Sequence, residues 1–408
     1  MSFKDKGSYS VQRTAYSVAS GRAGFVQRTA SCVQRTKTHS QLSRSTQYAV
    51  RRTQYAVRST QYERGTILII TLWVVSILAL FAVGIGYRMG LLIKMAGYKR
   101  DVKVARELAF AGFSWSLAQL AQDANAYDSL YECGITLEDE EEPDKVFQRL
   151  PVGQGYFTIS HAVRESRKWI LKPGFTDEER KINVNLAPFE LLAALPGVTP
   201  SLASAMIDWR DKNDDPLLDE SGNEKPFGAE QEQYEELAFS CKNAPFQAME
   251  ELRLVLGMTD EVYREIEPML TVYGDGKVNI NTAPAPVLEV LARASFDQVG
   301  GLERDIEHLV ERIIDHRDGF DDEEGTEGDE PFQNIKGDMS RLLLGTEERR
   351  LMDHMAEHYL TVSSRLFQIA SWGFLENPER RYLVRALVER GGGTKPTLTV
   401  RRWQEGFM

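Results

Sequence analysis

An acidic loop near the middle of the chain holds the residues best suited to chemistry. Its oxygen-bearing side chains are Asp211, Asn213, Asp214, Asp215, Asp219, Glu220 and Glu230. Crowded carboxylate and amide oxygens suit Ca²⁺, which takes about 6–8 oxygen ligands. Positions 211, 213 and 215 have the spacing of the first EF-hand ligands. However, Pro216 stands where an EF-hand needs Gly, and Gly222 stands where it needs Glu. The loop is therefore no EF-hand, and its residue types fit a metal site or a solvated acidic loop equally well.

Two other groups of polar residues are weaker candidates. The segment 318–330 is rich in acids and glycines but lacks apolar residues to order it, so we expect a flexible loop. His354 and His358 are four residues apart, which can suit zinc, but the His-Glu-x-x-His order is missing. We interpret them as a pair on a helix surface. No Gly-x-Ser-x-Gly, Cys-x-x-Cys or P-loop motif occurs, so we expect no enzymatic activity.

An uncharged apolar run, Thr66 to Gly86, lies directly behind Gly65. Its 21 residues reach about 31 Å as a helix, which matches the apolar core of a bilayer. A basic residue and a glycine lie immediately before the run, whereas a secretory signal peptide places small residues after a shorter apolar core. Cleavage after Gly65 would leave the membrane helix at the new N-terminus.

Charge is unevenly distributed along the chain. Residues 1–65 hold 12 Lys/Arg against 2 Asp/Glu, a net charge of +10. Because the formal net charge of the whole chain is −11, the residues after 65 carry −21. By the positive-inside rule, residues 1–65 are expected in the cytoplasm and the acidic body on the other side of the membrane. An acidic body argues against nucleic-acid binding, which needs clustered Lys/Arg. Of the three cysteines, only Cys133 and Cys241 could meet in an oxidising compartment, and their pairing stays open.

The elements are expected as follows. Residues 1–65 form a low-complexity, disordered leader, and one long helix covers 66–125. Its soluble half carries an apolar stripe of Val104, Leu108, Ala111, Trp115 and Ala118. Alternating segments predict strands in 145–185 and again in 357–403, and the region between them, 186–356, reads as helical. These boundaries predict an α+β protein with a helical domain inserted into a sheet domain.

The helical region repeats itself. Ile182-Asn-Val-Asn-Leu-Ala-Pro188 resembles Val278-Asn-Ile-Asn-Thr-Ala-Pro284. Each continues to a similar word, Asp208-Trp-Arg-Asp211 or Asp315-His-Arg-Asp318, and then to a Pro-Phe pair at 245–246 or 331–332. We expect two related helical units. The first contains Leu195-Pro-Gly197, which resembles a helix-hairpin-helix. It has no Lys or Arg from Glu190 to Ile207, so we expect a structural role and not DNA contact.

These words together resemble the type II secretion system minor pseudopilin K family, also called general secretion pathway protein K. The resemblance covers about residues 64–390. It is carried by Arg64-Gly65 before the apolar run, the two Asn-x-Asn words, Leu195-Pro-Gly197, Asp208-Trp-Arg-Asp211, Gly228-Ala-Glu230, Pro245-Phe246 with Glu251-Leu252, and Val278 to Pro284. The resemblance implies a pseudopilin fold, in which a long N-terminal transmembrane helix packs on a small antiparallel sheet. The inserted helical domain would contain helix-hairpin-helix (SAM-like) repeats.

The resemblance also implies specific sites. Prepilin peptidase would cleave between Gly65 and Thr66, and Thr66 would be N-methylated. The inserted domain would bind Ca²⁺, for which the carried-over ligands are Asp211, Asp214, Asp215, Asp219 and Glu230. The leader is longer than is usual in the family, and Thr66 replaces the usual large apolar first residue.

Position 70 predicts the role within the family. Most pilin-like subunits carry Glu at the fifth mature position, where it pairs with the N-terminal amine of the subunit ahead, but this chain has Ile70. A tip subunit has nothing ahead of it, and an unpaired carboxylate in lipid would cost several kcal/mol. We therefore expect a non-enzymatic subunit at the pseudopilus tip that initiates assembly and supports export of folded proteins across the outer membrane.

The partners that the resemblance implies are minor pseudopilins of the I and J types, the major pseudopilin, prepilin peptidase, the inner-membrane assembly platform and secreted substrate. Two alternatives remain open at this point. One is a minor pilin of a type IV pilus-like system, and the other is a membrane-anchored DNA-binding protein that uses the helix-hairpin-helix.

Overall fold

The computed structural model describes residues 42–132, 134–137, 142–165, 168–213, 228–234, 239–321, 323–377, 379–392 and 396–407. The chain divides into two compact units, Met1–Met89 and Gly90–Met408, and each is described by itself. Most of the predicted leader, residues 1–41, lies outside the described residues.

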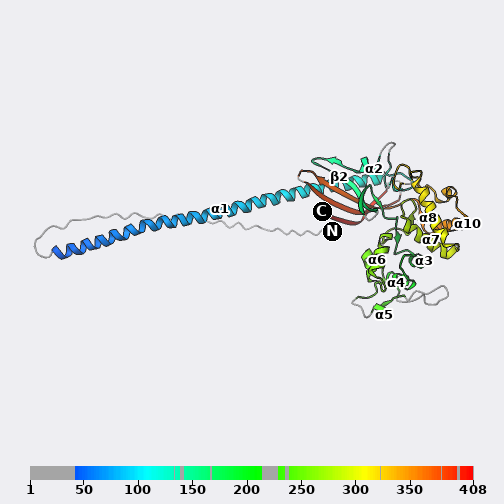
Figure 1. Ribbon diagram of the computed structural model, residues 1–408, viewed down its shortest axis with the longest axis horizontal. Coiled ribbons are helices and arrows are strands. Elements are labelled where there is room, and N and C mark those ends of the chain that lie inside the picture. The colour runs from blue at the N-terminus through cyan, green and yellow to red at the C-terminus, as the bar shows by residue number, and fades with distance from the viewer. Residues whose placement is uncertain are drawn as a thin grey trace, which may run out of the picture. The chain divides into compact units, whose positions relative to one another are not determined.

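Helix α1 covers Leu42–Gln122 (Figure 1). It ends close to the expected residue 125, but it begins inside the predicted leader, so the expected start at Thr66 is not a helix boundary. From Ile67 onward the large apolar side chains of the uncharged run are exposed. Among the described residues, α1 is the one helix that is long and apolar enough to cross a membrane, and this segment fits a membrane anchor.

An antiparallel sheet forms the β-part of the second unit. Its strands are β1 (Leu150–Val152), β2 (Gly155–Glu165), β3 (Lys168–Pro173), β4 (Thr176–Asp177), β9 (Leu366–Leu375), β10 (Arg380–Arg390) and β11 (Leu398–Phe407). The order is β1-β2-β9-β10-β11, with β3 paired to β2 and β4 paired to β9. Short helix α2 (Pro143–Phe147) precedes β1. Because β2 pairs directly with β9, segments from both sides of the helical region complete one sheet, as the alternating segments predicted.

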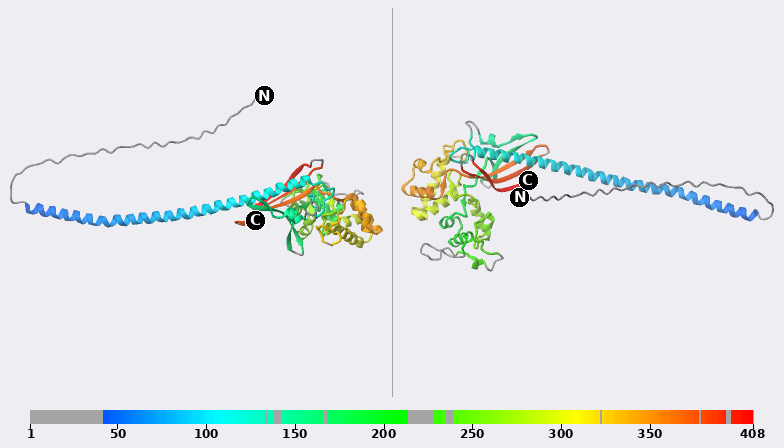
Figure 2. Two further views of the ribbon diagram at one scale, coloured as in Figure 1. Left: turned by 90° about the horizontal axis from the view of Figure 1, so that it is seen from above. Right: turned by 180° about the vertical axis from the view of Figure 1, so that it is seen from behind.

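The C-terminal part of α1 lies along this sheet (Figure 2), and small residues make the contact. A Cβ at Gly373 of β9 would collide with the backbone of Ala105 and Ala109, so helix and strand approach backbone to backbone. Ser371 donates a hydrogen bond from Oγ to the carbonyl oxygen of Ala109 (2.8 Å). The predicted stripe is therefore wrong in detail: Ala118 is exposed, and the buried face contains Ala105, Leu108, Ala109, Gly112, Phe113 and Ser116. Close approach selects small side chains, which a search for large apolar residues does not find.

The inserted region contains helices and two short parallel strand pairs. Its helices are α3 (Phe189–Ala193), α4 (Pro200–Arg210), α5 (Gln231–Tyr234), η1 (Met249–Leu254), α6 (Asp260–Ile266), η2 (Glu267–Met269), α7 (Ala285–Val299), α8 (Glu303–Asp318), α9 (Ile335–Asp338), η3 (Met339–Leu342) and α10 (Thr346–His358). Its strands are β5 (Ile182–Asn183), β6 (Leu270–Thr271), β7 (Val278–Asn279) and β8 (Leu360–Thr361). One buried core runs from Ile182 to Leu360, separate from the core between α1 and the sheet.

The predicted internal repeat is present in the hydrogen bonds. We name residues 182–271 the first repeat and 278–361 the second repeat. Strand β5 pairs in parallel with β6, as β7 pairs with β8. Asn185 Nδ2 donates a hydrogen bond to the carbonyl oxygen of Phe246 (3.0 Å), and the Phe246 amide donates to Asn185 Oδ1 (2.7 Å). Asn281 makes the same two bonds with Phe332, at 2.9 and 2.7 Å. We call the segments 182–188 and 278–284 the Asn-turns. Each Asn-turn is thus hydrogen-bonded to the Pro-Phe pair that follows the acidic loop of its own repeat.

Candidate functional site

Helix α4 positions the first two acidic residues of the site. It begins at a capped turn, where Thr199 Oγ1 accepts a hydrogen bond from the Leu202 amide (3.2 Å). It ends at Arg210, whose guanidinium donates to the carbonyl oxygens of Val184 and Ala187. Burial lowers the pKa of Arg210 to about 10. Arg210 thereby attaches the end of α4 to the Asn-turn, and this places Asp208 and Asp211 one helical turn apart on a fixed element.

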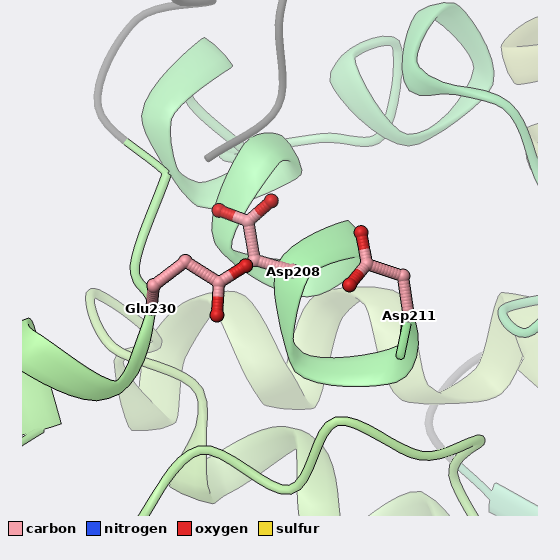
Figure 3. A group of neighbouring side chains, drawn as sticks. All are labelled: Asp208, Asp211 and Glu230. Carbon is pink, nitrogen blue, oxygen red and sulfur yellow. The ribbon is translucent and has the colours of Figure 1, made fainter. Parts of the chain in front are cut away.

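Three carboxylates from two segments gather at this end of α4. Asp208 and Asp211 lie at the end of the helix, and Glu230 immediately precedes α5 (Figure 3). One oxygen of each lies within 4.8 Å of the others. Asp208 is fully buried and Glu230 is 5% exposed, while Asp211 is half-buried. Burial raises the cost of charged carboxylates, and three carboxylate oxygens at this spacing could hold a metal ion.

The surroundings hold Asp208 and Glu230 in place. A Cβ at Gly228 would collide with Asp208 Oδ2, so the chain two residues before Glu230 passes directly over the Asp208 carboxylate. Cys241 contacts the backbone of both segments: its Sγ lies 3.7 Å from the Asp208 carbonyl oxygen and 3.8 Å from that of Ala229. Burial raises the pKa of the Cys241 thiol. Trp209 packs against Tyr234 with ring centroids 5.5 Å apart. Two buried aromatic side chains therefore pack next to the carboxylates.

The donor set fits a hard divalent cation. All three side chains offer oxygen, the donor that Ca²⁺ and Mg²⁺ prefer, and none offers the sulfur or imidazole nitrogen typical of zinc sites. Three carboxylates supply part of the six to eight oxygens of a Ca²⁺ shell, so further ligands would come from the adjoining loop.

The structure brings together some of the predicted ligands and adds one. Asp211 and Glu230 lie close together, and their role as Ca²⁺ ligands stays a prediction. Asp214, Asp215 and Asp219 lie outside the described residues. Asp208 was missed, because it belongs to a helix and not to the acidic loop. Its i, i+3 spacing from Asp211 at a helix end was the available signal.

The second repeat does not gather its equivalent acids in the part that the structure describes. Asp315 is exposed, and Asp318 accepts a hydrogen bond from Arg317 Nε (3.1 Å). The second acidic loop, expected to be flexible, has internal hydrogen bonds. Thr326 Oγ1 donates to Asp321 Oδ2 (2.7 Å), and Asp329 accepts from the amides of Gly325 and Thr326 (both 3.1 Å). These hydrogen bonds connect the described residues of the loop to one another, and its flexibility stays a prediction.

The remaining predicted residues are not members of the carboxylate cluster. Gly65, Thr66 and Ile70 are all in α1, and Ile70 is exposed. Cys241 is a buried free thiol, while Cys133 lies outside the described residues. The rings of His354 and His358 are 4.4 Å apart, and His354 Nδ1 lies 3.0 Å from Ser295 Oγ. The cleavage and methylation of the Gly65–Thr66 junction stay predictions.

Comparisons with known proteins agree on one family. The family model described as type II secretion system (T2SS), protein K, matches residues 176–275, which include Asp208, Asp211 and Glu230. The type II secretion system protein K of Pseudomonas aeruginosa is 24% identical over 360 residues, covering 84% of this chain and 94% of the relative. One solved chain, from the crystal structure of the GspK-GspI-GspJ complex of the enterotoxigenic Escherichia coli type 2 secretion system, is 17% identical. That match has a TM-score of 0.49 and covers 76% of this chain and 99% of the other. By the family model over residues 176–275 and by the relative over 360 residues, the chain is similar to type II secretion system protein K.

Proposed function

We propose that this chain is a non-enzymatic minor pseudopilin that caps the type II secretion pseudopilus and initiates its assembly. The observation that carries the proposal is the exposed apolar run of α1 directly behind Gly65. An apolar helix that begins at a cleavable junction can serve first as an inner-membrane anchor and then as the packing surface of a filament subunit. The leader would lie in the cytoplasm and the acidic body in the periplasm.

Ile70 supports the position at the tip. A carboxylate at this place needs an amine from the preceding subunit, and a tip subunit has no such neighbour. The inserted region, with a core of its own, suits a cap better than a repeating shaft subunit. The family resemblance implies that the I-type and J-type minor pseudopilins, the major pseudopilin, prepilin peptidase, the assembly platform and secreted substrate are the partners.

Substitution at position 70 tests the tip role. We expect Ile70→Glu to reduce pseudopilus formation and substrate secretion, measured by shearing and by assay of the culture medium. Ile70→Leu is the matched control, because it changes the same position but keeps an apolar side chain in the exposed run. Wild-type assembly in the Ile70→Glu strain, or an equal loss in both strains, would contradict an effect specific to the carboxylate at position 70.

We propose further that the three-carboxylate cluster binds Ca²⁺. Asp208, Asp211 and Glu230 would supply the fixed oxygens, and Asp214, Asp215 and Asp219 are the carried-over candidates for the rest of the shell. The cation would neutralise the buried carboxylates and join the end of α4 to the segment before α5. Saturation at about 100 times Kd would stabilise the fold by about 2.7 kcal/mol.

The metal claim is tested with Tb³⁺, a calcium analogue whose luminescence is sensitised by nearby tryptophan. Trp209 adjoins Asp208 in the sequence, so we expect a Tb³⁺ signal that Ca²⁺ displaces. Asp208→Asn should remove the signal, whereas the repeat-matched control Asp315→Asn should keep it. Equal thermal melting with Ca²⁺ and with chelator would contradict the site.

The hairpin between α3 and α4 is proposed to be a structural helix-hairpin-helix. Gly197 adopts a φ of +70°, as a tight turn requires, and Leu192, Leu195 and Leu202 are buried around it. No basic side chain lies between Glu190 and Ile207, so a phosphate would find no cation there. A gel shift with duplex DNA at low salt should therefore show no complex.

A further inference from the structure

The chain enters and leaves the inserted region at one place. It leaves the sheet after β4 and returns through residues 361–366 to β9. The two crossings lie side by side, because the Glu178 amide donates to the Leu366 carbonyl oxygen (2.9 Å). We call the buried side chains that surround this crossing the insertion joint: Asp123, Asp128, Asp177, Glu179 and Arg390.

Asp177 is the centre of the insertion joint. Its side chain is buried, and Oδ2 accepts hydrogen bonds from Asn279 Nδ2 (3.1 Å), Thr282 Oγ1 (2.5 Å) and Ser364 Oγ (2.6 Å). Asn279 and Thr282 belong to the second repeat, whereas Ser364 belongs to the returning crossing. One carboxylate therefore ties the sheet to the inserted region across more than 100 residues of sequence.

Asp128 and Arg390 form the second layer. Asp128 Oδ2 accepts from the Ser364 amide (2.7 Å) and from Arg390 Nη2 (3.0 Å), and the Asp128 carbonyl oxygen accepts from Asn279 Nδ2 (3.0 Å). Arg390 also pairs with Asp123 and donates to the Ser364 carbonyl oxygen (2.9 Å). The loop after α1 and strand β10 are thus held to the same crossing.

Glu179 completes the joint from the entering side. Its Oε2 accepts from the Arg365 amide (2.6 Å), and its carbonyl oxygen accepts from the Asn279 amide (2.9 Å). Its Oε1 is buried and has no hydrogen-bond partner among the described residues. A buried acceptor left in this state is costly, and a proton on the carboxyl group would reduce that cost.

Acidic groups outnumber basic ones in the joint. Four carboxyl groups, at 123, 128, 177 and 179, surround one largely buried guanidinium, Arg390. The other charged groups that face them are Arg180, Arg365, Asp275 and, beside Asp123, Glu132. Even with Arg180 and Arg365 counted, the acidic groups outnumber the basic ones, so removal of protons adds repulsion inside the joint.

Burial has the corresponding effect on titration. It raises the pKa of Asp128 and of Glu179 to about 7 each, and it raises the pKa of Asp177. Carboxyl groups that bind protons more tightly in the folded chain stabilise it most at pH below about 4. That contribution is lost as the pH rises to about 7.

We propose that the insertion joint is a proton-sensitive hinge between the sheet and the inserted region. Protonated carboxyl groups close it, and their ionisation near neutral pH loosens it, which lets the inserted region move relative to the sheet. The proposal concerns Asp128 and Glu179 and is independent of the cation site.

The test measures that movement directly in the full-length protein. Spin labels are placed at Arg402→Cys on β11 and Arg312→Cys on α8, both exposed, with the native cysteines replaced by alanine. The distribution of label distances is measured by pulsed electron paramagnetic resonance at pH 5.5 and pH 8. We expect a narrow distribution at pH 5.5 and a broader one at pH 8. The same distribution at both pH values would overturn the proposal.

Variants identify the groups responsible. Asp128→Asn and Glu179→Gln imitate the protonated carboxyl groups, so together they should keep the distribution narrow at pH 8. They should also remove the wild-type fall in Tm between pH 5.5 and pH 8, which we expect to be about 5 °C. Asp260→Asn, an exposed acid on α6, is the control and should behave as wild type. A pH-dependent Tm that is the same in wild type and the double variant would also contradict the hinge.

Discussion

At the scale of the residue, the three-carboxylate cluster depends on one glycine as much as on its acids. Gly228 lets the chain pass over Asp208, and this passage brings Glu230 to the end of α4. We expect Gly228→Ala to lower the free energy of unfolding by about 1–3 kcal/mol, because the new methyl group must displace a buried carboxylate. Tb³⁺ titration should show weakened binding as well. Gly406→Ala is the control, since no atom lies within 4 Å of its Cβ position. Equal effects of the two substitutions would refute this account.

The two Asn-turns offer a second comparison between single residues. Asn185 and Asn281 make matching pairs of hydrogen bonds to Phe246 and Phe332. Substitution of either by Ala leaves a buried amide and a carbonyl unpaired, at a cost of about 1–3 kcal/mol. We expect both variants to lose similar stability in chemical denaturation. Gln333→Ala, at an exposed position, should lose almost none. A loss confined to one repeat would show that the two Asn-turns differ in role.

At the scale of the element, the contact of α1 with β9 is made by backbone. Ala105, Ala109 and Gly112 recur every three to four residues and face Gly373 and Ser371. Gly373→Val should separate the helix from the strand and cost roughly 1–3 kcal/mol or more, seen as a lower Tm. Gly97→Ala, on the open part of the same helix, should instead leave Tm unchanged or raise it slightly. A harmless Gly373→Val substitution would contradict the close packing.

At the scale of the whole molecule, the described acidic residues of the two repeats are arranged in different ways. The first brings three carboxylates together, and the second uses hydrogen bonds between Asp321, Thr326 and Asp329. The Ala244 amide donates to the Trp209 carbonyl oxygen (3.3 Å). If the cluster binds Ca²⁺, chelation should therefore speed amide hydrogen exchange around Trp209, Asp211 and Ala244, with no change at 323–330. Exchange that changes in both repeats, or in neither, would be evidence against this difference.

Much of the architecture was readable from local pattern. The uncharged run, the alternating strands β2, β9 and β10, and the repeated Asn-Pro words all have short-range physical causes. Strand β3, strand β4 (which pairs with β9) and strand β6 (which pairs with β5) were not predicted. Two of these have only two residues, and their pairing partners lie far away in the sequence.

The sequence by itself determined the membrane-anchor segment, the duplicated inserted region and the family resemblance, because periodicity and ordered words are local properties of a chain. Only the tertiary structure decided that Asp208 joins Glu230, that small residues form the contact face of α1, and that Asp177 meets Ser364. Each of these depends on burial and close approach between segments that are distant in sequence. Burial is a property of the packed molecule, and the type and local spacing of residues along the chain do not specify it.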